Sequence, residues 1–125
     1  MFTKLNENNE LLSVNQRRIA GILYDWEAIL QKHFHDNVEA HTVMFFLHVA
    51  SKDVPVDLTS IGQALGLSKA ATSRNYYRLS EGRTGVGGLD LMKSLVDYND
   101  RRRMLITLTP KGIAIAKELT EFIQL

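Results

Sequence analysis

Residues 100–110 read Asp-Arg-Arg-Arg-Met-Leu-Ile-Thr-Leu-Thr-Pro, and they are the most informative stretch of the chain. Three consecutive arginines follow a turn signal at 99–101, and strand-like residues flank them at 91–98 and 104–109. Adjacent guanidinium groups repel one another, so they add little to stability unless an anionic surface lies opposite. The stretch therefore predicts a β-hairpin with a cationic tip, and Thr109-Pro110 predicts the start of a helix directly after it.

A pair of short helices is predicted upstream of this hairpin. The first is capped by Asp57 or Thr59 and closes at Gly66, which suits a left-handed C-cap. Ser68 is then placed to cap a second helix that runs to residue 79. Two short helices joined across such a tight turn are typical of a helix-turn-helix. A helix-turn-helix followed by an arginine-tipped hairpin is the layout of a winged-helix DNA-binding protein.

Helical spacing sorts the second helix into two faces. The inward face is predicted to comprise Thr72, Tyr76 and Leu79, and the outward face Ala70, Ser73, Arg74 and Tyr77, with Lys69 and Arg78 beside it. An outward face that combines small residues, hydrogen-bond donors and cations suits a helix that enters the major groove. Arg74 is the first candidate for bidentate contact with guanine, and Ser68 and Lys69 lie at the helix N-terminus, which favours phosphate.

Positive charge is local rather than general in this chain. The formal net charge of the 125 residues is only +1, but four basic residues face one acidic residue across 69–83, and three arginines adjoin at 101–103. A hydrophobic content of 45% is enough for one core and excludes a disordered chain. The absence of cysteine excludes disulfides and thiolate metal sites.

The flanking segments predict two longer helices. Ser13 and Gln16 form a capping box, and a helix-spaced apolar series follows: Ile19, Ile22, Leu23, Trp26, Ile29, Leu30 and Phe34. Part of that stripe is expected to face a second subunit. Residues 38–51 are apolar nearly all round and predict the buried central helix. A final helix after Pro110 is expected to bury Ile113, Ala116, Leu119, Phe122 and Ile123, and residues 1–12 are expected to form a flexible tail that precedes one domain at 13–125.

The chain resembles MarR-type winged-helix regulators. Leu65-Gly66-Leu67-Ser68-Lys69, Ser73-Arg74 and Arg78-Leu79 are similar to the helix-turn-helix of that family, and 100–103 with 108–112 are similar to its wing and the helix that follows. The resemblance covers about residues 14–125. It implies a mainly α-helical winged helix-turn-helix with a small β-hairpin wing, and a homodimer that binds double-stranded DNA at a pseudo-palindromic operator, usually as a repressor.

The same resemblance assigns roles to the wing. Arg102 would enter the minor groove, flanked by Arg101 and Arg103, and Asp100 would steady the wing by hydrogen bonds or an ion pair. One departure from the family is the glycine-rich segment at 82–88, which predicts a flexible loop and a longer link between recognition helix and wing. Arg83 would then add a phosphate contact, or the wing would be repositioned.

Other functions have weaker support in the sequence. His33, His35 and His41 are zinc-ligand types, but they lie on an expected surface turn without a clear fourth ligand, so neither a metal nor a cofactor is expected. No nucleophile elbow, phosphate loop or paired carboxylates indicate an enzyme. A winged helix that serves replication, plasmid partition or phage control, and one that binds an acidic protein partner, stay open as alternatives.

Location and ligand response are less well determined by the sequence. No apolar run approaches the roughly 20 residues that span a bilayer, and the first ten residues lack a signal-peptide pattern, so a cytoplasmic location without membrane contact is expected. Nothing in the residues identifies an effector ligand, the operator sequence or the regulated genes.

Overall fold

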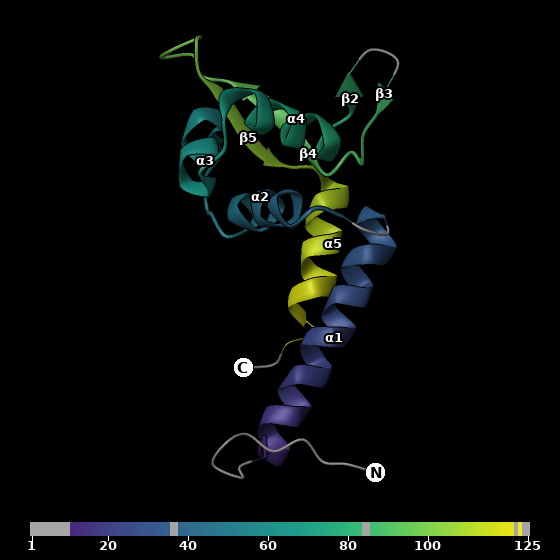
Figure 1. Ribbon diagram of the computed structural model, residues 1–125. Coiled ribbons are helices and arrows are strands. Elements are labelled where there is room, and N and C mark those ends of the chain that lie inside the picture. The colour runs from purple at the N-terminus through teal and green to yellow at the C-terminus, as the bar shows by residue number, and fades with distance from the viewer. Residues whose placement is uncertain (1–10, 36–37, 84–85, 122, 124–125) are drawn as a thin grey trace.

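The structure is a computed structural model that describes residues 11–35, 38–83, 86–121 and 123, and of Arg83 and Val86 it describes the backbone alone. The predicted tail therefore lies almost entirely outside the described residues. The elements in chain order are α1 (Val14–Phe34), α2 (Ala40–Ala50), β1 (Val56–Asp57), α3 (Leu58–Leu65), α4 (Lys69–Leu79), β2 (Gly82–Arg83), β3 (Val86–Gly87), β4 (Met92–Val96), β5 (Met104–Leu108) and α5 (Pro110–Glu121). Figure 1 shows a globular part built around α2, from which α1 and α5 project together.

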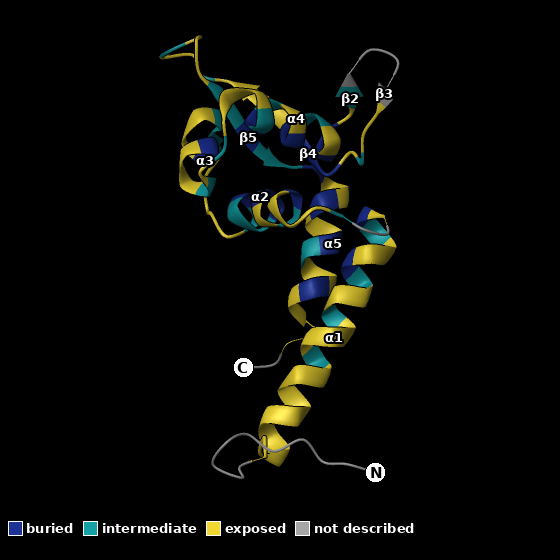
Figure 2. Ribbon diagram, in the orientation of Figure 1, coloured by how far each residue is buried: buried dark blue, intermediate teal, exposed yellow. Residues whose placement is uncertain are grey.

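The long first helix begins at the predicted capping box. Ser13 Oγ accepts from the Gln16 backbone N–H at 3.0 Å, and Gln16 Oε1 accepts from the Ser13 N–H at 2.8 Å. The C-terminal half of α1 packs on α5 and buries Leu30 and Phe34. Residues 11–21 are all exposed, and Figure 2 shows this end of α1 standing clear of the other helices and of the strands.

The core forms where α2 meets the helix-turn-helix and the sheet. Phe45 and Phe46 of α2 are fully buried, and the Phe46 ring meets the Phe34 ring edge to face at 5.2 Å. The other buried apolar side chains come from every major element, namely Leu30, Val49, Ile61, Tyr76, Leu79, Leu91, Met92, Ile106, Ile115 and Leu119. The prediction that 38–51 supplies the central helix is confirmed.

A three-stranded antiparallel sheet carries the hairpin. The strand order is β1-β5-β4, with Val56 opposite Ile106 and Met92 opposite Leu108. The wing, defined as β4, β5 and the turn at 97–103 between them, is therefore three residues shorter in its first strand and one residue shorter in its second strand than predicted. Thr109 caps the N-terminus of α5, as predicted, because its Oγ1 accepts from the Gly112 N–H at 3.1 Å.

Two predictions about local structure are wrong. Residues 82–88 do not form a simple loop: β2 and β3 pair as a second, smaller hairpin, with Gly82 opposite Gly87. The buried face of α5 was predicted only in part: Leu119 is buried and Ala116 packs on the core as expected, but Ile113 is 45% exposed and Ile123 is 37% exposed. Ile115, which was not predicted, is 5% exposed, because α5 packs on α1, α2 and β5 together. Phe122 lies outside the described residues.

Close helix crossing fixes the angle between α3 and α4. Gly62 of α3 lies directly against Thr72 of α4, and a Cβ built at Gly62 would collide with Thr72 Oγ1. Thr72 is held in place because its Oγ1 donates to the Ser68 carbonyl at 2.7 Å. The helix-turn-helix therefore depends on a residue without a side chain at this crossing.

We predict that Gly62→Ala lowers the free energy of unfolding by about 1–3 kcal/mol, the usual cost of overpacking. Urea unfolding of the wild-type and variant proteins measures this change in the free energy of unfolding. In a Thr72→Ala background the same substitution should cost less, since the colliding atoms are gone. A stabilised Gly62→Ala protein, as expected for an unhindered helix position at about 1 kcal/mol, would contradict the close crossing.

Candidate nucleic-acid interface

The turn between α3 and α4 has the geometry that its sequence predicts. Asp57 caps α3, since its Oδ2 accepts from the Ser60 N–H at 3.2 Å. Gly66 adopts the left-handed conformation, with φ 67° and ψ 29°, and closes the helix. Ser68 Oγ then accepts from the Ala71 N–H at 3.1 Å and starts α4. These caps set the position of α4, the candidate recognition helix.

The inner face of α4 is buried as predicted, with one addition. Thr72, Tyr76 and Leu79 are at most 5% exposed. Asn75, which was not predicted to face inward, is 1% exposed. Its Oδ1 accepts from Thr42 Oγ1 at 2.6 Å, and its Nδ2 donates to the Ala71 carbonyl at 2.8 Å. The buried amide therefore ties α4 to α2, which explains a polar residue at this position.

The outer face of α4 lines an open groove of about 760 Å³. Its walls are Lys69, Ala70, Ser73, Arg74, Tyr77 and Arg78 from α4, together with Gly82 and Gly87 from the second hairpin. Four of the six α4 residues were predicted to face outward and the other two, Lys69 and Arg78, to lie beside them, and the structure places all six around one groove. Ser68 lies exposed at the N-terminus of the same helix, but its hydroxyl accepts the capping hydrogen bond.

The two arginines of α4 differ in their surroundings. Arg78 Nη1 pairs with Glu39 at 3.1 Å and donates to Thr42 Oγ1 at 3.3 Å, so it is held toward α2. The hydrogen bond that Arg78 donates to the Glu39 carboxylate, together with the charge of Arg78, keeps the pKa of Glu39 below its ordinary value. Among the described residues, no carboxylate forms an ion pair with Lys69 or Arg74. Arg74 is therefore the more available arginine.

The turn of the wing is built on a carboxylate that the sequence interpretation missed. Asp97 Oδ1 accepts from the backbone N–H groups of Asn99 at 2.9 Å and Asp100 at 3.3 Å. Its other oxygen pairs with Arg103 Nη1 at 3.3 Å. An Asp two residues before Asn is a recognisable turn signal, which could have found it.

The three arginines of the wing have three different environments. Arg103 points back into the molecule and pairs with Asp97 and, through Nε at 3.6 Å, with Asp57. Arg102 is 91% exposed at its side chain, and its Nε donates to Asp100 Oδ1 at 3.0 Å. The Arg101 guanidinium lies 5.9 Å from the centre of the Tyr98 ring. Asp100 thus pairs with a neighbouring arginine inside the turn of the wing, as the resemblance implied. Arg103 joins the wing to the start of α3 through Asp57.

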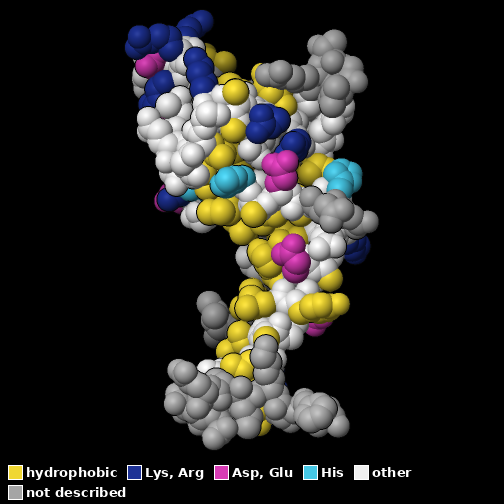
Figure 3. All heavy atoms as spheres, viewed as in Figure 1, with side chains coloured by type: hydrophobic (Ala, Val, Ile, Leu, Met, Phe, Trp, Pro, Cys, Tyr) yellow, Lys and Arg dark blue, Asp and Glu magenta, His cyan; other side chains and the backbone are white. Residues whose placement is uncertain are grey.

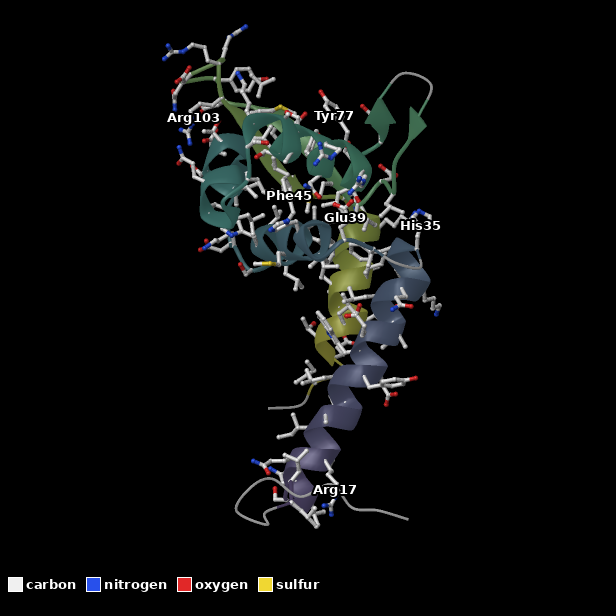
Figure 4. All side chains as sticks on the ribbon, in the orientation of Figure 1. Arg17, His35, Glu39, Phe45, Tyr77 and Arg103 are labelled. Carbon is white, nitrogen blue, oxygen red and sulfur yellow. The ribbon has the colours of Figure 1, made fainter. Side chains whose placement is uncertain are left out.

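The predicted cationic elements lie at one end of the molecule. Figure 3 shows Lys and Arg side chains gathered over the wing and over α4, with few acidic side chains between them. In Figure 4, Arg103 and Tyr77 lie at this end and Arg17 lies at the far end of α1. The side chain of Arg83 lies outside the described residues, so its predicted phosphate contact stays a prediction.

The histidines do not come together into a metal site in the described part of the chain. His33 Nε2 lies 2.7 Å from Glu118 Oε2, which joins α1 to α5. No group of three potential ligands is close enough to hold an ion among the residues that the structure describes. None of the helices there combines the length and apolar character that a bilayer span requires.

Comparison with known proteins agrees with this geometry. No family model and no curated protein matches the sequence. Solved structures do match, and the S. aureus MepR–DNA complex is 20% identical over 88% of this chain and 82% of that chain, with a TM-score of 0.65. The fold is that of the MarR-type winged helix.

Two other MarR-type structures show the same likeness. A mutant MarR from E. coli in complex with operator DNA is 19% identical over 85% of this chain and 71% of that chain, with a TM-score of 0.56. The PcaV transcriptional regulator from Streptomyces coelicolor is 17% identical over 86% and 73%, with a TM-score of 0.55. At such low identity the likeness establishes the MarR-type fold and leaves the function to be argued from the site.

The contact between Asp100 and Arg102 predicts a pH dependence. Hydrogen bonds from the Arg102 side chain, and then from its backbone, hold the pKa of Asp100 below its ordinary 3.8. Because the folded-state pKa is lowered, the contact is complete above pH 3.8 and is lost as pH falls through the lower value. The Arg102 Nε–H resonance, followed by NMR, should shift with a midpoint below 3.8 and should not titrate in Asp100→Asn. A midpoint at or above 3.8 would refute the contact.

Proposed function

We propose that this protein is a sequence-specific double-stranded DNA-binding transcriptional regulator that acts as a homodimer, as a repressor. The observation that carries the proposal is the placement of the outer face of α4 beside the wing at one end of the molecule. A helix about 10–12 Å across fills a major groove about 12 Å wide, and a hairpin beside it can then reach the adjacent minor groove. MepR and MarR are described as DNA complexes, which supports the same use of the fold.

Roles follow from the surroundings of each side chain. Arg74, which pairs with no carboxylate in the described part of the chain, is assigned to base edges, with Ser73 and Ala70 as small neighbours that let the helix approach. Arg102 is assigned to the minor groove and Arg101 to phosphate. Arg103 is assigned to anchoring the wing, since two carboxylates already pair with it. Lys69 at the N-terminus of α4 is assigned to phosphate.

The homodimer is supported by the apolar surface that α1 and α5 leave uncovered. Leu23 and Ile19, which lie one turn apart on the same side of α1, are 54% and 43% exposed, and Ile113 of α5 is 45% exposed. Such a stripe on a helix that projects from the domain is an unfavourable surface for a monomer. A second copy would bury it and place two α4 helices on one side of the assembly, as a two-fold operator requires.

Selection of bound duplexes from a random pool tests the proposal most widely. We expect an enriched pseudo-palindrome whose half-site centres are about 10 bp, or a multiple of it, apart. Sedimentation of the protein alone should give a dimer. No enrichment, with salt-sensitive binding to every duplex, would instead favour a general DNA-packaging role. No binding to any duplex would favour the protein-interaction alternative.

Arg102→Ala and Arg74→Ala should separate positioning from base recognition. Arg102→Ala is expected to weaken binding to all sequences and to reduce the salt slope by about one ion per subunit. Arg74→Ala is expected to lose about 1–3 kcal/mol of discrimination at one position of each half-site.

Fluorescence anisotropy at several salt concentrations measures both effects. Arg17→Ala is the matched control, since this arginine lies at the far end of α1 (Figure 4). If Arg74→Ala weakened all operator variants equally, Arg74 would be a phosphate contact. If Arg102→Ala left the salt slope unchanged, the wing would not contact DNA.

A further inference from the structure

The second hairpin, which is the pair of strands β2 and β3, lies on the side of α4 away from the wing. Figure 1 shows α4 between two hairpins, with the tip of the wing on one side and β2 and β3 on the other. This glycine hairpin is the element that replaces the predicted flexible loop. It forms one wall of the 760 Å³ groove, where Gly82 and Gly87 face the α4 side chains.

The base of the glycine hairpin is fixed to the end of α4. The backbone N–H groups of residues 88–91 donate in turn to carbonyls of Glu81, Arg78, Ser80 and Leu79 at 2.7–3.1 Å. A Cβ at Gly88 would collide with the Ser80 and Tyr77 carbonyls, so the chain passes this point in close backbone contact. Four hydrogen bonds and a close approach therefore hold the strands in a definite direction beside α4.

The groove has the chemistry of a site for a polyanionic strand. Its α4 wall carries Lys69, Arg74 and Arg78, of which Arg78 pairs with Glu39, and none of the described residues that line it is acidic. The opposite wall includes Gly82 and Gly87, where a sugar–phosphate backbone can approach closely because glycine carries no side chain. Ala70 and Tyr77 provide apolar surface of the kind that packs on deoxyribose. Charge complementarity and shape thus favour the same occupant.

Groove dimensions in DNA explain why two hairpins would flank one helix. When a helix occupies the major groove, the two sugar–phosphate strands that border the groove run along its two sides. The wing stands on one side of α4. The strand on the other side would run where the structure has the groove between α4 and the glycine hairpin.

We infer that the glycine hairpin is a second DNA-contacting wing, and that the groove between it and α4 receives one sugar–phosphate strand of the bound duplex. The inference rests on the proposed function, because it concerns the same duplex. It assigns to the glycine-rich segment a function that the arginine-tipped wing does not cover, and it extends the contacted region of each half-site to both borders of the major groove.

Gly87 offers a direct test because a side chain fits there in the free protein. A Cβ at Gly87 meets no heavy atom of the described residues within 4 Å, and the φ of Gly87 is not in the left-handed region. Gly87→Asp should weaken binding of the selected duplex about tenfold. Gly87→Lys should tighten it a few-fold and steepen the salt slope by about 0.9 per subunit, the value for one added phosphate contact. A gain of affinity cannot come from misfolding.

Lys52→Ala is the matched control, since it lowers the net charge by one, as Gly87→Asp does, but lines a different hollow between the end of α2 and α5. It should bind within about two-fold of wild type. Hydroxyl-radical footprints should show that Gly87→Asp loses protection at one border of the major groove and Arg102→Ala at the neighbouring minor groove. If the wild-type protein binds DNA and both Gly87 variants bind it with the same affinity, the proposal of a second DNA-contacting wing is wrong. If wild type binds no DNA, the proposed function itself fails.

Discussion

Asp57 joins the wing to the helix-turn-helix, because one carboxylate contacts both. Its Oδ2 accepts from the first turn of α3, and its Oδ1 lies 3.6 Å from Arg103 Nε. The same residue pairs with Leu105 in the sheet, so backbone and side chain act together. A partly exposed ion pair of this kind adds at most about 1 kcal/mol to stability. Its importance is geometric, since it sets the direction of the wing relative to α4.

The run of three arginines is tolerated because each guanidinium has a separate neighbour. Arg103 lies between Asp57 and Asp97, Arg102 contacts Asp100, and Arg101 lies over the Tyr98 ring. The repulsion that the sequence suggested is therefore relieved within the turn itself. One arginine is used to hold the wing and two stay exposed, which gives the tip a fixed shape and two cations directed to solvent.

Sequence patterns predicted most of the architecture, because its determinants are local. The caps at Ser13, Gly66 and Ser68 are short-range signals, and the structure confirms each. Longer-range contacts could not be predicted in the same way. Periodicity predicted the burial of Leu119 but not the exposure of Ile113, since the covered side of α5 depends on three packing partners.

In the candidate site, too, local features were predicted from the sequence and long-range contacts were not. The outward face of α4 followed from helical spacing, and the structure brings all its predicted members to one groove. The pairing of Arg78 with Glu39 and of Arg103 with Asp57 joins residues far apart in the chain, and only the fold brings them together. Glycines at 82–88 indicated flexibility, but paired backbone groups gave a hairpin, because carbonyls at the end of α4 were available as acceptors.

The central claim is that one duplex lies against α4 and the wing at the same time. Titration of ¹⁵N-labelled protein with the selected duplex, followed by amide resonances, tests it most directly. The account predicts coincident changes across 69–78 and 97–103, at one protein-to-DNA ratio, with the exposed end of α1 unaffected. Changes confined to α1 and α5, or to one of the two predicted segments alone, would contradict it.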